Sequence, residues 1–127
     1  MWKLSLAAVA VGLMSVTANA QDLAAGEKVF KKCKACHAVG EGAKNKVGPQ
    51  LNGIIGAEAA KVEGFKYSKA MMESGLVWDE ATLTEYLVKP RDLVKGTKMA
   101  FAGLKKEEDI TNISAYLGSF AADGTQQ

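Results

Sequence analysis

The chain has 127 residues, of which 48% are hydrophobic and 24% charged, and its formal net charge is +2 at pH 7. This length allows one small domain, and so nearly balanced a charge argues against nucleic acid as a partner. Two cysteines and a single histidine leave few ways to bind a bare metal ion.

The first 20 residues have the form of a secretory signal peptide. Lys3 gives a positive start, Leu4 to Val16 is a short and almost wholly apolar run, and Ala18-Asn19-Ala20 is an A-x-A cleavage site. A membrane-spanning helix needs about 20 apolar residues, so an uncleaved anchor is the weaker alternative. We therefore expect a leader over residues 1–20 and a soluble, exported, periplasmic domain over residues 21–127.

A first helix is predicted from Leu23 to about Lys32, behind an N-cap at Asp22. Gly26 lies inside it, where glycine costs about 1 kcal/mol relative to alanine. A glycine at that position indicates that another backbone packs closely. Beyond His37, repeated glycines predict a long irregular loop, which is uncommon in a small domain unless it serves a site.

Ser68 should cap a short helix that ends at Gly75, and Asp79 should cap the next one, Glu80 to Val88. That helix should stop at Lys89-Pro90, because the residue before a proline disfavours helical backbone.

Arg91 is expected to open an irregular stretch to Leu104. The last helix, Glu107 to about Phe120, is the most clearly predicted, since apolar residues recur in it every three or four positions. No paired strands are indicated. The sequence therefore predicts an all-α domain of four to five short helices and long loops.

The pentapeptide Cys33-Lys34-Ala35-Cys36-His37 is a C-x-x-C-H sequence, the attachment signature for c-type haem. Two thiols at this spacing can form thioether bonds to the two vinyl groups of one porphyrin, and the adjacent imidazole can ligate its iron. A disulfide would gain little from so short a loop and would not use the histidine. A thioredoxin-like pair would need a βαβ pattern, and zinc would need about four ligands. We expect one haem c per chain, bound covalently through Cys33 and Cys36, with His37 on the iron.

A second axial ligand cannot be another histidine of this chain, because there is none. Met71, Met72 and Met99 are the candidates after the leader. The first two lie on a predicted helix, where methionine often fills the core, whereas Met99 lies in an irregular, glycine-bounded segment. This favours Met99. A Met/His pair raises the reduction potential and closes both axial positions, which favours one-electron transfer over catalysis.

Positive charge is concentrated in two blocks. Residues 28–46 hold six lysines and one acid, and residues 89–106 hold six lysines or arginines and one acid. The stretch between them, 47–88, holds three lysines and six acids. One basic block contains the C-x-x-C-H motif and the other contains Met99, so we expect a positive collar around the haem edge that steers an acidic partner. Two ordinary solvated faces are the alternative.

The chain resembles class I cytochrome c, of the bacterial cytochrome c2 and mitochondrial cytochrome c type. The resemblance covers Gly26 to Leu117. Besides C-x-x-C-H, its motifs are Gly48-Pro49-x-Leu51, Gly64-Phe65-x-Tyr67-Ser68, Trp78, Lys89-Pro90, Gly96-Thr97-Lys98-Met99 and Tyr116-Leu117.

This resemblance implies the cytochrome c fold and roles for individual residues. His37 and Met99 would be the axial iron ligands, and the carbonyl of Pro49 would accept a hydrogen bond from His37. Tyr67, Ser68 and Trp78 would contact the haem propionates. Tyr86 and Thr97 would belong to the hydrogen-bond network near Met99 and the propionates. Gly26 and Tyr116 would mark the crossing of the first and last helices. The positive face would comprise Lys32, Lys34, Lys46, Arg91, Lys98, Lys105 and Lys106.

Three positions depart from the family pattern. Ala57 stands where many relatives have an arginine, and Met71 where mitochondrial relatives often have an asparagine, so two polar partners of a propionate are missing. A propionate without them should titrate at higher pH. Lys95 replaces a common proline, which should loosen the Met99 loop.

We therefore expect a monomeric electron carrier that is not an enzyme. The resemblance implies quinol:cytochrome c oxidoreductase as its donor, and a terminal oxidase or a photosynthetic reaction centre as its acceptor. A peroxidase or a gas-sensing haem module would need an open iron, and a peroxidase also a distal acid/base, for which no second histidine exists.

Overall fold

The computed structural model describes residues 10, 12 and 18–127, so most of the predicted leader lies outside the described residues. Five helices follow in chain order: α1 Ala18–Phe30, α2 Lys69–Glu73, α3 Glu80–Val88, α4 Pro90–Leu93 and α5 Glu107–Gly118. Within the described part of the chain, β pairing is limited to two isolated bridges, Glu58 with Val77 and Phe120 with Gln126. The predicted all-α fold is confirmed.

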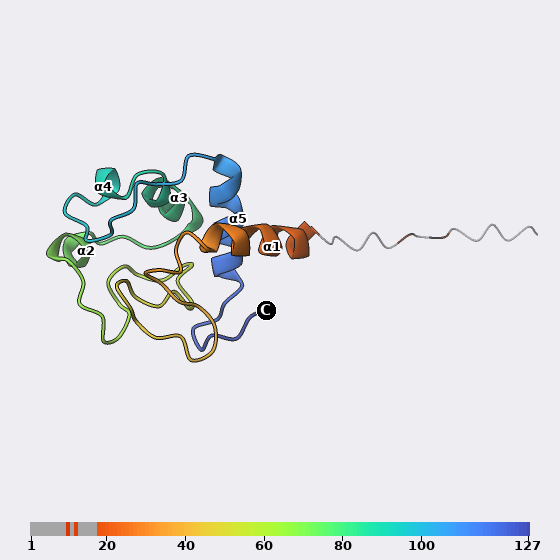
Figure 1. Cartoon of the computed structure of the whole chain (residues 1–127), viewed down its shortest axis with the longest axis horizontal. Coiled ribbons are helices and arrows are strands. Elements are labelled where there is room, and N and C mark those ends of the chain that lie inside the picture. Colours follow the sequence, from red (N-terminus) through yellow and green to blue (C-terminus); the bar gives the residue numbers. More distant parts are fainter. Residues whose placement is uncertain (1–9, 11, 13–17) are drawn as a thin grey trace, which may run out of the picture.

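Helix α1 runs across α5, and the two pack closely, as Figure 1 shows. A Cβ at Gly26 would collide with the carbonyl oxygen of Asn112 and would lie 2.5 Å from Cβ of Tyr116. Gly26 is therefore the residue at which the two backbones meet. The aromatic ring of Tyr116 packs at this crossing, 5.5 Å from the ring of Phe30 between centroids.

The core is one cluster to which α1, α2, α3 and α5 contribute side chains. Val29 and Phe30 of α1 pack in it together with Ile110, Ile113 and Leu117 of α5, the residues whose spacing predicted the last helix. Leu83, Tyr86 and Leu87 of α3 and Met71 of α2 belong to the same cluster.

The predicted caps of the two middle helices are present. The Ser68 side chain accepts a hydrogen bond from the N–H of Met71 at the start of α2, and Asp79 accepts one from Thr82 at 2.7 Å at the start of α3. The backbone hydrogen bond lowers the pKa of the Asp79 carboxyl. Gly75, at φ 65°, follows α2 in the left-handed region that glycine tolerates.

Two predicted boundaries are wrong. Helix α1 begins at Ala18 and not behind a cap at Asp22, because alanine, the best helix former, carries the helix through that residue. The stretch from Arg91 is not irregular at its start, since Pro90–Leu93 forms α4. Pro90 is its first residue, where a missing N–H costs no helical hydrogen bond.

The long segment between α1 and α2 lies below the short helices in Figure 1. The C-terminal tail folds back onto it: the N–H of Gly53 donates to the carbonyl of Phe120, and Gly124 packs against the carbonyl of Gly40. No helix among the described residues is long and apolar enough to cross a membrane.

Candidate haem site

The C-x-x-C-H motif forms a hydrogen-bonded turn directly after α1. The N–H of Cys33 donates to the carbonyl of Phe30 at 2.8 Å, and the N–H of His37 donates to that of Cys33 at 2.9 Å. Both cysteines are half-buried free thiols. Burial, with a smaller contribution from Cys36, raises the pKa of the Cys33 thiol. One short hydrogen-bonded turn thus presents two free thiols and the imidazole.

His37 is oriented by a residue 12 positions along the chain. Its Nδ1–H donates to the carbonyl oxygen of Pro49 at 2.7 Å, which leaves Nε2 as the nitrogen with a free lone pair. Burial lowers the pKa of the imidazole, and the Pro49 hydrogen bond only partly opposes this. The ring is therefore neutral at pH 7, the form that binds metals.

Gly48 packs directly against the His37 ring. A Cβ at Gly48 would collide with the His37 ring, 2.8 Å from Nδ1 and 2.9 Å from Nε2. The sequence marked Gly48 only as part of a Gly-Pro motif and did not assign it this role. The signal available in the sequence was a glycine directly before Pro49, the residue expected to bond to His37.

Met99 is connected to Tyr86 through Thr97. The hydroxyls of Tyr86 and Thr97 are hydrogen-bonded at 2.8 Å, and the N–H of Met99 lies 3.4 Å from Thr97 Oγ1. Met99 is half-buried and packs against the core, whereas Met71 is buried within the core and Met72 is 60% exposed. Of the three methionines, Met99 alone lies in a loop with a polar network around its backbone.

The residues expected near the propionates supply hydroxyl donors. Tyr67 accepts a hydrogen bond from the N–H of Val62 at 3.0 Å, and Ser68 accepts one from the N–H of Met71 at 3.1 Å. Each hydroxyl therefore keeps its own proton for a carboxylate. Trp78 is buried, with its ring 4.9 Å from that of Tyr86.

Ala57 and Met71, the two positions at which a polar partner of a propionate is missing, contribute no polar side chain. Ala57 lies in a backbone contact, since its carbonyl accepts from the N–H of Trp78 at 2.8 Å, and Met71 packs in the core.

The Cytochrome c family profile matches residues 23–121. The chain is 56% identical over 107 residues to cytochrome c2 of Rhodoblastus acidophilus, a match that covers 84% of this chain and all of that one. It is 50% identical to cytochrome c-550 of Nitrobacter winogradskyi, over 81% of this chain and 94% of that one. Among solved structures, cytochrome cH from Methylobacterium extorquens matches with a TM-score of 0.71 and 45% identity, covering 76% of this chain and 96% of that one.

The chain belongs to the cytochrome c family. It is a class I c-type cytochrome with covalently bound haem c, and it is an electron carrier and not an enzyme. The residues present fit that group: two free thiols at C-x-x-C spacing, and a neutral imidazole with a free nitrogen.

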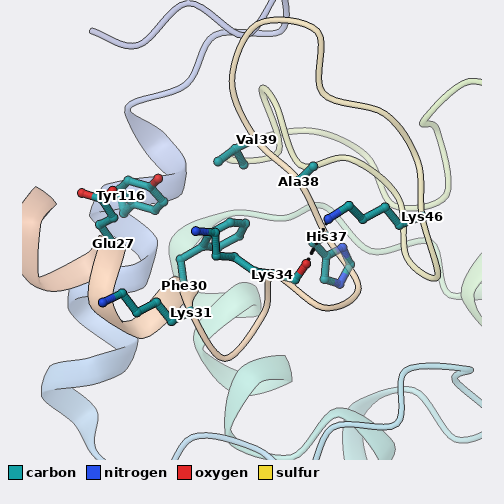
Figure 2. A pocket seen from close by; sticks show the side chains of 9 residues that line it. All are labelled: Glu27, Phe30, Lys31, Lys34, His37, Ala38, Val39, Lys46 and Tyr116. Atoms are coloured by element: carbon teal, nitrogen blue, oxygen red, sulfur yellow. Dashed lines mark hydrogen bonds between the residues drawn. The ribbon is translucent and has the colours of Figure 1, made fainter.

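This cytochrome has a hollow of about 190 Å³ beside His37, which Figure 2 shows from close by. Lys31, Lys34 and Lys46 line it, and the Lys46 ammonium donates to the carbonyl of Lys34 at 3.1 Å. Glu27 and Tyr116 line its other end. Three exposed lysines thus line the same hollow as His37.

The cations of the expected positive face are exposed. Within the described residues, ion pairs are limited to Lys69–Glu73 and Lys89–Asp92, both on the surface. None of the seven members of the face takes part in them. The exposed members are Lys32, Lys34, Lys46, Arg91, Lys98, Lys105 and Lys106.

Proposed function

We propose that this cytochrome is a soluble periplasmic one-electron carrier whose haem iron is held between His37 and Met99. Thioether bonds from Cys33 and Cys36 would attach the porphyrin. The observation that carries the proposal is the 2.7 Å hydrogen bond from His37 Nδ1 to the Pro49 carbonyl, which directs Nε2 as ligand. The bound haem supplies a one-electron iron couple.

Met99 is the second ligand in this proposal. A thioether on iron favours the ferrous state and raises the reduction potential. The Thr97 hydroxyl beside the Met99 N–H, with Tyr86 behind it, would hold the loop in register. Tyr67, Ser68 and Trp78 would contact the propionates, the two hydroxyls by donating hydrogen bonds to them.

The partners in this proposal are membrane redox complexes. A quinol:cytochrome c oxidoreductase would donate electrons, and a terminal oxidase or a photosynthetic reaction centre would accept them. The exposed, unpaired cations around the motif support docking to an acidic surface. Association should be transient and should weaken with salt, because exposed charges are screened beyond about 8 Å at physiological ionic strength. We propose that the mature carrier is a monomer.

Export is part of the same proposal. Cleavage after Ala20 would leave a chain that begins at Gln21. Mass spectrometry of the periplasmic fraction should show this chain plus one haem. A haem-loaded protein that retains residues 1–20 in the membrane fraction would contradict it.

The ligand pair is tested by optical spectra of the ferric and ferrous holoprotein beside Met99→Ala, with Met72→Ala as matched control. We expect a low-spin wild type with a sulfur-to-iron charge-transfer band, both lost in Met99→Ala along with a fall in potential. Met72→Ala, which removes an exposed methionine, should match the wild type. A high-spin wild type that binds carbon monoxide rapidly would overturn the proposal in favour of an enzyme or gas sensor.

A further inference from the structure

The segment that carries Pro49 is held by amide side chains in place of regular secondary structure. We call residues 38–52 the proximal loop; it contains no helix or strand. Asn45, Gln50 and Asn52 bond its backbone at several points. All four of these bonds are partly buried, so water competes with them less than with surface bonds.

Asn52 closes the two ends of the loop. Its Oδ1 accepts from the N–H of Gly40 at 2.8 Å, and its Nδ2 donates to the carbonyl of Gly40 at 2.8 Å. One amide side chain thereby pairs with both polar groups of one backbone residue, as a neighbouring strand would. The loop cannot open at Gly40 without losing both bonds.

Asn45 closes a smaller turn around Pro49. Its Oδ1 accepts from the N–H of Gln50 at 2.9 Å, and its Nδ2 donates to the carbonyl of Glu63 at 3.0 Å. The side chain of Gln50 in turn accepts from the N–H of Asn52 at 2.7 Å. The two asparagines are thus joined through Gln50.

Pro49 lies between Asn45 and Asn52, and the position of its backbone depends on the hydrogen bonds that these side chains make. It has no N–H of its own to anchor it. Its neighbours bond to the end of the motif and to the residue after it. The N–H of Gly48 donates to the carbonyl of Cys36 at 2.8 Å, and the N–H of Leu51 donates to the carbonyl of Ala38 at 3.0 Å. The position of the Pro49 carbonyl relative to His37 is therefore decided by the backbone of the loop.

We propose that Asn45 and Asn52 are positioning residues that keep the Pro49 carbonyl on His37 Nδ1 and so tune the iron. This inference rests on the proposed role of His37 as ligand. A hydrogen bond donated by the ring N–H that does not face the iron raises the basicity of a ligating imidazole. A looser loop weakens that bond, makes the imidazole a poorer donor to ferric iron and raises the reduction potential.

The test uses holoprotein variants Asn52→Ala and Asn45→Ala. Thr111→Ala is the matched control: it also removes one side-chain bond to backbone, 3.1 Å to the Glu107 carbonyl, but in α5. At a fixed mediator potential we expect each asparagine variant to raise the ratio of reduced to oxidised protein about threefold, equivalent to about 30 mV at 59 mV per tenfold change. Proton exchange at His37 Nδ1, followed by NMR of the ferrous protein, should be about tenfold faster.

Thr111→Ala should change neither measurement. Asn45→Ala and Asn52→Ala that lose stability but keep the potential and the exchange rate of the wild type would show a merely structural role and overturn the inference. If Asn52→Ala does not fold, Asn52→Ser keeps a hydroxyl too short to bond both groups of Gly40 and should give a smaller shift of the same sign. A low-spin His/Met spectrum in the wild type separates failure of this inference from failure of the proposed function.

Discussion

Gly26→Ala should destabilise this cytochrome, although alanine is the better helix former. Intrinsic propensity alone favours the substitution by up to about 1 kcal/mol. Against this, the new Cβ would collide with the Asn112 carbonyl oxygen and lie 2.9 Å from its carbon. That neighbour is backbone in the middle of α5, so it cannot rotate aside.

The helices must therefore separate. Overpacking in a close-packed core costs about 1–3 kcal/mol, and at this crossing the rigid neighbour places the cost at the upper end. After subtracting the propensity gain of up to about 1 kcal/mol, we expect a net loss of about 2 kcal/mol. For a domain of this size that lowers the melting temperature by about 8–16 °C.

The assay is guanidinium unfolding of the holoprotein, followed by circular dichroism and by Trp78 fluorescence. Gly118→Ala is the matched control, because a Cβ there would meet Ile55 Cγ1 at 3.6 Å, an ordinary contact. It should be neutral or stabilising by up to about 1 kcal/mol. Equal stabilisation by both substitutions would refute the argument, because helix propensity, and not the close contact of α1 with α5, would then determine the change in stability.

Three further predictions concern Ser114, Ala60 and Asp79. Ser114→Ala should stabilise the fold by about 1 kcal/mol, because the buried Oγ of Ser114 has no hydrogen-bond partner among the described residues. As a control in the same denaturation assay, Ser119→Ala loses a 2.6 Å hydrogen bond to a carbonyl of α5 and should destabilise the fold by a similar amount. Ala60→Gly should stabilise by about 0.5–1 kcal/mol, because Ala60 has φ 61°; a lower melting temperature would contradict this. Asp79→Ala should lower stability at pH 7. The N–H of Thr82 lowers the pKa of Asp79, so this contribution is present above about pH 4 and is lost as pH falls further. Asp79→Asn should show no such pH dependence in thermal melts.

Much of the fold could be predicted from the sequence because its signals are local. Ser68 and Asp79 cap the helices that follow them, within three residues of the N–H groups they bond. The apolar period of α5 predicts the burial of Ile110, Ile113 and Leu117, but not that of the polar residues Asn112 and Ser114. The C-x-x-C-H turn is equally local, since His37 bonds to Cys33. Where local signals conflicted, as at Asp22, alanine propensity prevailed over the cap.

The tertiary structure decided the contacts between residues distant in the chain. A Gly-Pro pair could suggest a role for Pro49, but only folding brings Gly48 against the His37 ring. The pairing of Asn52 with Gly40, 12 residues away, has no periodic signature in the sequence, because an amide can bond any backbone group that the loop brings near it. Gly26 indicated a close neighbour, yet the identity of Asn112 followed from the crossing of α1 and α5. Caps and periodicity act over one or two helical turns, whereas the geometry around His37 depends on loop closure, and loop closure is decided by packing.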